Sequence, residues 1–399
     1  ETMEMKRIWA ALASVLILAG CQEAAEYEPS IYITEAQREQ AKVVTISAAG
    51  EKARFSISAS QIVDRDTRVT VEVCPELLES YNISSGRSSI LLDETLYDFS
   101  KNEATIKAGT NVSDDIEITM NQPLDPGKFY CLPLRIVHTD GSMPILASSS
   151  TLYLVLRAPA RGKGVYIGSG NKYVVSGFYN QSDLSALPEV TLECRVYVEN
   201  FQNNNPYISS IMGLEGEVCL RFGDVKIDNN VFQVCKGDYQ PAATASPCST
   251  GKWYHVAGVW SRSTLRIYLD GQFVTEMKHK GETVNLSTVH SSPSGKIGFG
   301  LGCASIYQGN RPLDGYLAEA RVWTRALSAN EIANVKDLVV VDPQSPDLLA
   351  YWKMDECEKT NYQDPNSSWT INNKIVDQTG HGYDACGLSG NPSFKEATW

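Results

Sequence analysis

The sequence predicts an all-β protein made of two sandwich domains, an expectation that rests on two patterns and one interruption. Short segments that alternate apolar and polar residues recur along the chain, as in strands with one buried face. Glycine, proline, asparagine and aspartate residues stand between these segments as turn signals. Residues 159–164 break the alternation with proline and glycine, so we expect an inter-domain linker there. At roughly 150 residues per domain, 399 residues suit two or three domains.

The first domain is expected over residues 32–158. Val69, Val71 and Val73 share one face of a strand, and about seven such short strands fall in this stretch. That density favours an immunoglobulin-like β-sandwich. The run 128–136, Lys-Phe-Tyr-Cys-Leu-Pro-Leu-Arg-Ile, resembles the signature of an N-terminal domain of unknown function. That domain recurs in surface lipoproteins of glycan-utilisation systems.

The second domain is expected over residues 165–399. Apolar residues alternate along the segment 190–198, which predicts a strand with one face in the core. The segment 253–260 is apolar on both faces, as a central strand of a sandwich would be. The tryptophans within these strand patterns are predicted to lie in the core: Trp253, Trp260, Trp323 and Trp352.

Two local signals punctuate this second domain. Asp270-Gly271 stands between two strand-like runs and predicts a two-residue hairpin turn, in which both turn residues need positive φ. Ser328 followed by Glu331 predicts a capping box at the start of a short helix.

The order of motifs in the second domain resembles the LamG family, which has the concanavalin A-like lectin/glucanase fold. The motifs are residues 253–257, 267–271, 313–323 and 325–332. The resemblance implies two packed antiparallel sheets with a jelly-roll topology. A further LamG-like segment, 349–384, opens the domain in many relatives. Here it comes last, so we expect it to add an edge hairpin after the core.

The balance of charge excludes several classes of protein. The chain has 35 Lys and Arg residues against 47 Asp and Glu residues, a formal net charge of −12. A nucleic-acid binder would show a basic face, so no nucleic-acid partner is expected. The same balance argues against attachment to anionic lipid by charge. No apolar run reaches the roughly 18 residues that a membrane-spanning helix needs.

The N-terminal segment has the character of an export signal. Lys6 and Arg7 form a short positive region, and residues 8–19 are apolar apart from one serine. The run ends in Leu18-Ala19-Gly20-Cys21, which resembles the lipobox of bacterial lipoproteins. A generic secretory signal with a chance cysteine is the alternative interpretation.

The lipobox resemblance implies a lipid anchor. Residues 1–20 would be a signal peptide, Cys21 the acylated first residue of the mature chain, and residues 21–31 a lipidated tether. The acidic residues after Cys21 are similar to a signal that sends lipoproteins to the outer face of the outer membrane. We therefore expect a lipid-anchored, surface-exposed outer-membrane protein that contacts the membrane through this anchor only.

A structural calcium ion is the one cofactor that the sequence suggests. Asp377-x-x-Gly380-x-Gly382 offers a carboxylate and flexible backbone carbonyls, the hard oxygen ligands that Ca²⁺ prefers. In LamG relatives a matching Asp and a Glu on the late strand often hold a structural Ca²⁺. The residues at these positions are Asp377, Gly380 and Glu319. The alternative is an Asx-type turn with a surface glutamate and no metal.

No residue is assigned a catalytic role. Glucanases of this fold carry two carboxylates on one strand face, spaced Glu-x-Asp-x-Glu or similarly, and the chain has no such string. Glu215 and Glu217, and the acids in 355–358, are read as solvated side chains. No nucleophile elbow, dinucleotide fingerprint or P-loop occurs.

Loop residues of the second domain are the candidates for carbohydrate binding. Sugar sites on β-sandwiches combine aromatic rings, which meet the apolar face of a pyranose, with amides or carboxylates that bind its hydroxyls. The two best loops are 203–207 and 305–310. The candidates are Asn205, Tyr207, Tyr239, Tyr307, Asn310 and Trp369.

The cysteines fit an exported protein. Ten are present, and nine remain once Cys21 is set aside, so at least one thiol stays free unless chains cross-link. No C-x-x-C motif occurs, which argues against zinc or thioredoxin-like chemistry. Proximity in the sequence alone suggests the pairs Cys219–Cys235 and Cys357–Cys386.

These expectations converge on a non-catalytic component of a glycan-utilisation system that binds a polysaccharide or oligosaccharide, or a surface protein partner. Two alternatives remain open. One is a glycoside hydrolase of concanavalin A-like fold with a non-standard carboxylate pair. The other is an adhesion or structural protein that binds a protein partner through the LamG domain.

Overall fold

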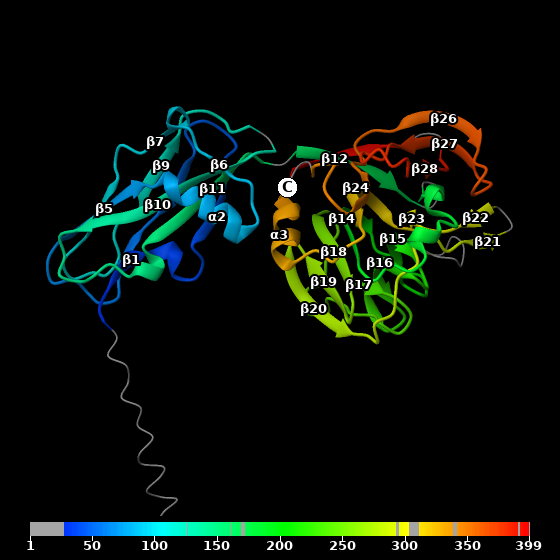
Figure 1. Cartoon of the computed structure of the whole chain (residues 1–399), viewed down its shortest axis with the longest axis horizontal. Coiled ribbons are helices and arrows are strands. Elements are labelled where there is room, and N and C mark those ends of the chain that lie inside the picture. Colours follow the sequence, from blue (N-terminus) through cyan, green and yellow to red (C-terminus); the bar gives the residue numbers. More distant parts are fainter. Residues whose placement is uncertain are drawn as a thin grey trace, which may run out of the picture. The chain divides into compact units, whose positions relative to one another are not determined.

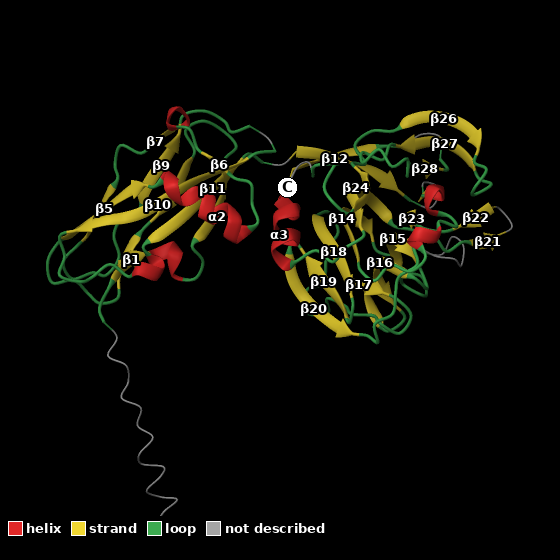
Figure 2. Ribbon diagram, viewed as in Figure 1, coloured by secondary structure: helices red, strands yellow, loops and turns green. Residues whose placement is uncertain are grey.

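The computed structural model describes residues 28–125, 127–159, 161–168, 172–292, 295–302, 311–337, 341–389 and 392–398. This described part is built almost entirely from β-strands, with two short α-helices (Figures 1 and 2). The all-β prediction is confirmed. The signal peptide and Cys21 lie outside the described residues. No helix among the described residues is both long and apolar enough to cross a bilayer.

The chain divides into two compact units. The first contains the residues up to 81 together with 89–124 and 129–157. The second contains the residues from 158 onward together with the short segments 82–88 and 125–128. Each unit has its own sheets and its own core.

Three sheets form the first unit. The largest has the order β2-β11-β10-β5-β8 with β6 paired to β10, the second is β3-β9-β7, and the third pairs β1 with β4. The strands are β1 (Ile31–Ile33), β2 (Ala41–Thr45), β3 (Lys52–Phe55), β4 (Ile57–Ala59), β5 (Thr67–Val73), β6 (Ile90–Leu91), β7 (Tyr97–Asp98), β8 (Glu103–Ile106), β9 (Ile116–Met120), β10 (Phe129–Thr139) and β11 (Thr151–Arg157), and the helix is α2 (Leu78–Ser85).

The alternation seen in the sequence sets the core of the first unit. Val69 and Val71 of β5 are fully buried, and Ile116 and Ile118 of β9 bring the inner face of the second sheet into the core. β10 lies between β11 and β5, so both of its edges are paired. Its residues 130–136 are all buried except Arg135, which is half-buried. Two pairings, β2 with β11 and β6 with β10, are parallel.

Two eight-stranded sheets and one two-stranded sheet, β21-β22, form the described part of the second unit. One has the order β20-β19-β18-β14-β24-β12-β29 with β25 paired to β24, and we call it the first sheet; the other, the second sheet, has the order β17-β16-β15-β23-β13-β28-β27-β26. The strands are β12 (Arg161–Ile167), β13 (Tyr173–Val174), β14 (Val190–Asn200), β15 (Ser209–Leu214), β16 (Val218–Asp224), β17 (Ile227–Cys235), β18 (Trp253–Ser261), β19 (Thr264–Leu269), β20 (Gln272–Lys278), β21 (His290–Ser292), β22 (Gly295–Ile297), β23 (Gly300–Leu301), β24 (Asp314–Trp323), β25 (Leu348–Trp352), β26 (Glu358–Gln363), β27 (Thr370–Ile375), β28 (Ala385–Gly387) and β29 (Phe394–Thr398).

The core of the second unit lies between these two sheets. Leu192 and Val196 of β14 contribute from the first sheet, while Phe222 and Phe232 contribute from the second. All the strand pairs within the two sheets are antiparallel, as the LamG resemblance implies. Of the tryptophans predicted to lie in the core, Trp260, Trp323 and Trp352 are buried. Trp253 is only half-buried and packs against a neighbouring tyrosine at the surface.

The stretch read as a linker, 159–164, is largely a strand. From Arg161 onward it forms β12, which pairs with β29 on one side and β24 on the other. Gly164 is there for close packing, because a Cβ atom at this position would lie 2.4 Å from the Trp253 ring and 2.8 Å from the Leu317 carbonyl oxygen. The prediction assigned this glycine to a linker, whereas the fold requires that position 164 carry no side chain.

The last fifty residues are part of both sheets. β26 and β27 form the expected hairpin at the edge of the second sheet, whereas β25 pairs with the central strand β24 of the first sheet and buries Trp352 completely. Strands β26, β27 and β28 extend the second sheet at one end, and β29 adds the edge strand of the first sheet. The orange and red strands in Figure 1 follow this path.

Helix α3 (Ala329–Asp337) begins at the predicted capping box. The Ser328 backbone N–H donates to Glu331 Oε2 (2.8 Å), and the Glu331 N–H donates to Ser328 Oγ (3.2 Å). The helix covers the outer face of the first sheet with Ile332, which is fully buried in a cluster that contains Tyr268 and Trp323. The predicted hairpin turn is also present, since Asp270 and Gly271 have φ values of 49° and 75° between β19 and β20.

Candidate functional site

A row of polar side chains crosses β15, β16 and β17 on the outer face of the second sheet. Ser210, Arg221 and Gln233 are directly opposed in the strand register. Directly opposed residues of antiparallel strands share a face, so the three side chains lie side by side. Their neighbours Phe222 and Phe232 point the other way, into the core. The polar row is almost fully covered, with Arg221 only 4% exposed.

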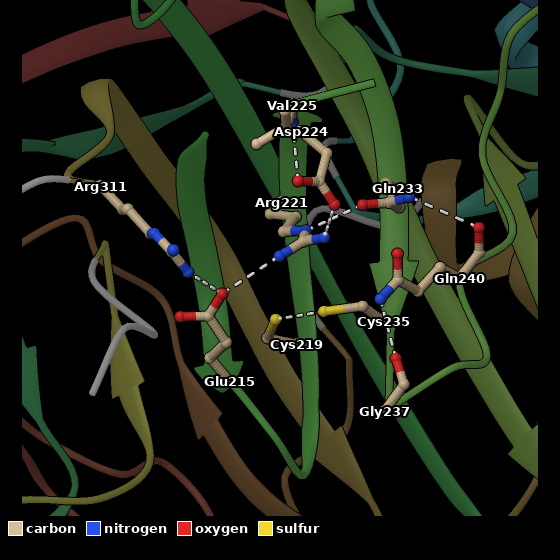
Figure 3. A network of polar contacts seen from close by, with 10 residues as sticks. All are labelled: Glu215, Cys219, Arg221, Asp224, Val225, Gln233, Cys235, Gly237, Gln240 and Arg311. Atoms are coloured by element: carbon tan, nitrogen blue, oxygen red, sulfur yellow. Dashed lines mark hydrogen bonds and ion pairs between the residues drawn. The ribbon is translucent and has the colours of Figure 1, made fainter. Parts of the chain in front are cut away.

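Arg221 is the centre of this row and donates in three directions (Figure 3). Its Nε bonds to Gln233 Oε1 (2.8 Å), its Nη1 to Glu215 Oε1 (3.2 Å) and its Nη2 to Asp224 Oδ2 (2.5 Å). A planar guanidinium with a fixed fork of donors orients each of these acceptors. We call these residues, together with Arg311, the Arg221 cluster.

Arg311 joins the cluster from the segment that precedes β24. Its guanidinium forms a close ion pair with the same Glu215 oxygen that accepts from Arg221. Its carbonyl accepts from the Ser210 N–H (2.9 Å), which fixes the segment against β15. The other oxygen of Glu215, Oε2, is buried and has no hydrogen-bond partner among the described residues. A buried carboxylate oxygen without a donor is costly.

One predicted sugar-binding loop borders this cluster. Tyr207 is 40% exposed and has a φ of 64°. A Cβ atom at position 223 would lie 2.2 Å from the Tyr207 carbonyl oxygen, so only glycine permits this contact. The Asn229 side chain of β17 donates to the Gln202 carbonyl (3.1 Å) and holds this loop against the strand. The exposed Asn205 and Tyr207 therefore lie beside the turn that carries Asp224.

The second predicted loop cannot be placed in the same way. Tyr307 and Asn310 lie outside the described residues, immediately before Arg311 in the sequence. Their part in sugar binding stays a prediction.

Two other candidates pack in different surroundings. The ring of Tyr239 packs against Trp260 and His279, with centroid distances of 6.0 and 5.6 Å, at the edge of the core. Trp369 donates to the Lys296 carbonyl (2.8 Å) between β26 and β27, at the opposite end of the second sheet. Their half-buried rings hold loops in place, and sugar binding by Tyr239 and Trp369 stays a prediction.

Three of the acids read as solvated pair with basic side chains. Besides Glu215, Glu217 accepts from Lys236 (3.4 Å) and from the Thr288 hydroxyl (2.9 Å). Glu358 pairs with Lys374 (3.2 Å). The solvated interpretation of Glu215 and Glu217 is wrong because neighbouring strands and loops bring cations to both, an arrangement that sequence spacing does not reveal.

Asp377, the first proposed calcium ligand, closes a tight turn. Its carboxylate accepts from the backbone N–H groups of Tyr351 (3.0 Å), Thr379 (3.1 Å) and Tyr383 (3.2 Å), and from the Thr379 hydroxyl (2.8 Å). Gly380 follows in the turn with a φ of 81°. Four donors occupy the carboxylate as in an Asx-type turn, which leaves little of it for an ion.

Glu319, the other proposed ligand, is buried and contacts a different part of Tyr351. Its Oε2 accepts from the Tyr351 hydroxyl (2.5 Å), while Asp377 accepts from the backbone of the same residue. The length of a tyrosine side chain therefore separates the two carboxylates. The described residues contain no group of three or more His, Cys, Asp or Glu with metal-binding geometry. These residues do not fit a shared ion, and calcium binding stays a prediction.

Sequence reasoning did not anticipate the ion cluster beneath α3. Glu193 of β14 and Arg321 of β24 are fully buried, and Glu193 also accepts from His255 Nε2 (3.0 Å) and from the Trp323 indole (2.9 Å). Burial alone would raise the pKa of Glu193, but Arg321 and the two hydrogen bonds outweigh it and lower the pKa to about 2. For His255, burial disfavours the charged imidazolium and lowers the pKa, although the hydrogen bond to Glu193 acts in the opposite direction.

Comparison with known proteins finds two family models that match parts of the chain. Residues 168–333 match the model of the concanavalin A-like lectin/glucanases superfamily. Residues 27–143 match a model described as an N-terminal domain. The chain is therefore an all-β protein whose second unit has the concanavalin A-like fold, as the LamG resemblance implied. No curated protein sequence matches the chain.

One solved structure supports the same fold. A crystal structure from Bacteroides ovatus, described as a candidate carbohydrate-binding protein, is 22% identical, with a TM-score of 0.51 over 92% of this chain and 99% of that one. At this identity the likeness shows the fold alone. A heptameric SAP-like pentraxin from Limulus polyphemus is 13% identical, with a TM-score of 0.34 over 57% of this chain and 95% of that one. That score supports no inference.

Proposed function

We propose that this chain is a cell-surface lipoprotein that binds carbohydrate without catalysis as part of a glycan-utilisation system. Three features support the proposal: the lipobox-like segment ending at Cys21, the concanavalin A-like second unit, and the similarity of the whole chain to a candidate carbohydrate-binding protein. The lipid would anchor the protein in the outer membrane, and the second unit would capture glycan.

The Arg221 cluster beside Tyr207 is the observation that carries this proposal. The Tyr207 ring is exposed, so one of its faces can meet the C–H face of a pyranose. The partly exposed carboxylate of Asp224 and guanidinium of Arg311 supply a charged acceptor and charged donors for hydroxyl groups. The polar groups are fixed by Arg221 before any ligand arrives, which lowers the entropic cost of binding.

One observation favours glycoside hydrolysis as a second candidate. Glu215 and Asp224 bind different nitrogens of the same guanidinium, so two carboxylates lie on one face of the second sheet. Glycosidases place two such groups across the scissile bond. In this chain, however, both carboxylates are engaged by Arg221, and Glu215 by Arg311 as well. Binding without turnover is the simpler use of the arrangement.

A binding screen tests the proposal directly. The purified full chain is incubated with a panel of insoluble and soluble polysaccharides, and every glycan that retains it is assayed for released reducing sugar. Each incubation is repeated with EDTA and with added Ca²⁺. Retention without sugar release is the expected result, and loss of retention in EDTA would give the predicted calcium a role in shaping the site.

Two results would overturn the proposal. Released reducing sugar would establish hydrolysis and direct attention to Glu215 and Asp224. Failure to bind any glycan would contradict carbohydrate binding and favour a protein partner instead.

A further inference from the structure

Two buried thiols face one another next to the Arg221 cluster, on the same face of the second sheet. Cys219 of β16 and Cys235 of β17 are opposed in the strand register, two residues before Arg221 and two after Gln233. Their Sγ atoms are 2.9 Å apart, and the residues are 1% and 3% exposed (Figure 3). They pack against one another as a small cluster separate from the main core.

The strand geometry brings these cysteines within reach of a covalent bond. Directly opposed residues of antiparallel strands have Cα atoms about 4.5–5.5 Å apart. Disulfides span Cα separations of about 4.4–6.8 Å. A small rotation of the two side chains is therefore enough to bring the sulfur atoms together, without moving either strand.

The surroundings favour sulfur chemistry over metal binding at this position. The guanidinium of Arg221 lies on the same face and disfavours a bound cation. The described residues offer no third His, Cys, Asp or Glu that would complete a metal site with the pair. Both thiols are almost fully buried in the folded unit, so a disulfide-bearing oxidant would reach them while the chain is folding.

We propose that Cys219 and Cys235 form a cross-strand disulfide when the protein is exported to a compartment that supplies a disulfide-bearing oxidant. The Cys235 thiolate attacks the oxidant disulfide and forms a mixed disulfide, releasing one oxidant thiolate. Cys219 then gives up its proton and attacks the Cys235 sulfur, which releases the second oxidant thiol. The two cysteines lose two electrons and two protons, and the oxidant disulfide is reduced to two thiols.

The disulfide would act on the candidate site through the hairpin that carries it. Arg221 and Gln233 lie on the same face as the two cysteines, one step along the strands. A covalent link between β16 and β17 therefore fixes the spacing between these two side chains, and with it the position of Asp224 at the hairpin end. Only the source of the oxidant depends on the proposed export, so the disulfide is testable whether or not the chain binds glycan.

Peptide mapping of the full chain tests the disulfide without any variant. Trypsin cleaves after Arg195, Arg221, Lys226 and Lys236, so the two cysteines fall in peptides 196–221 and 227–236. The protein is purified without reductant, alkylated in denaturant and digested. We expect the two peptides to appear joined, lighter by two hydrogen atoms than their sum, and to separate on reduction. A parallel sample is refolded in a mixture of reduced and oxidised glutathione.

Recovery of both peptides singly and alkylated from both samples would overturn the proposal. A link in the glutathione sample alone would support the pairing, because it shows that the two thiols join once an oxidant is supplied. Thermal unfolding supplies a second measurement: reduction, or Cys235→Ser, should lower the Tm by about 5–10 °C. Cys248→Ser, which alters another buried cysteine of the same unit, is the matched control and should keep the sensitivity to reductant. Equal Tm values for the oxidised and reduced protein would count against the proposal.

Discussion

Glu193 and Arg321 form an ion pair that is completely removed from solvent, with Glu193 Oε1 and Arg321 Nε 3.1 Å apart. They lie on the neighbouring strands β14 and β24, and helix α3 covers the face on which they meet. Both charges have lost their hydration, so each depends on the other and on the groups around it. This dependence makes the pair a sensitive probe of how the second unit is held together.

Removing one member of the pair should be costly. Arg321→Met leaves the Glu193 carboxylate buried without its cation, and we expect the free energy of unfolding to fall by about 3–5 kcal/mol. Six of the seven tryptophans follow residue 165, so fluorescence during urea unfolding reports on the second unit. The exposed pair Arg266–Glu276, with its charged atoms 3.0 Å apart, is the control. Arg266→Met should cost less than about 1 kcal/mol, and equal losses would contradict the account.

The pH dependence of stability should reveal His255. Its pKa is lowered in the folded protein by burial, so below its ordinary value of 6.5 the unfolded chain binds a proton that the folded chain does not. Stability from this residue therefore falls as the pH drops through 6.5. The difference in unfolding free energy between the wild type and His255→Gln should shrink between pH 7 and pH 5. A constant difference would show that the pKa of His255 does not change on folding, and a growing one would show that His255 gains a proton on folding; either contradicts the prediction.

Glu193 should contribute in a lower pH range. Its pKa falls from 4.5 to about 2 on folding, so its stabilising contribution is complete above pH 4.5 and is lost as the pH drops toward 2. Glu193→Gln removes that dependence. Urea midpoints measured at several pH values between 5 and 2.5 should converge for the two proteins at the acid end, and parallel curves would be inconsistent with the lowered pKa.

Substitution of Asp377 distinguishes its role in the turn from its predicted role as a calcium ligand. Asp377→Ala deprives three backbone N–H groups of their acceptor and should lower the unfolding free energy by about 1–3 kcal/mol in the presence of EDTA. A calcium titration of the wild type, followed by Tm, then tests the metal. A rise in Tm that Asp377→Ala abolishes would establish the predicted site, whereas an unchanged Tm would assign Asp377 to the turn alone.

Local chemistry was readable in the sequence where it acts over a few residues. Asp270-Gly271 forms the predicted hairpin turn, and Ser328 with Glu331 caps the predicted helix. The period-two pattern likewise placed Leu192 and Val196 in the core. In each case the signal and the structure it specifies lie within one element, so no knowledge of distant contacts was needed.

Features that depend on distant contacts were missed. The glycine at 164 reads as flexible until Trp253 and Leu317 are seen against it. Glu193 is one polar residue of an alternating strand, and its burial depends on Arg321 and on α3, which follow more than a hundred residues later. The Arg221 cluster was missed for the same reason, because Glu215, Asp224 and Arg311 gather around Arg221 only through strand pairing. An arginine on a strand with acids before and after it is the signal that could have found it.

Glycan binding by Tyr207 variants tests the central claim most directly. With a polysaccharide retained in the screen, the affinity of the full chain is measured by calorimetry for the wild type, Tyr207→Ala and Phe273→Ala. Phe273 is 53% exposed on the edge strand β20 of the other sheet and serves as the matched aromatic control. We expect Tyr207→Ala to weaken binding about tenfold, the effect of losing one aromatic contact with a sugar ring, and Phe273→Ala to leave it unchanged. Unchanged affinity in Tyr207→Ala would contradict the assignment of the site to the Arg221 cluster.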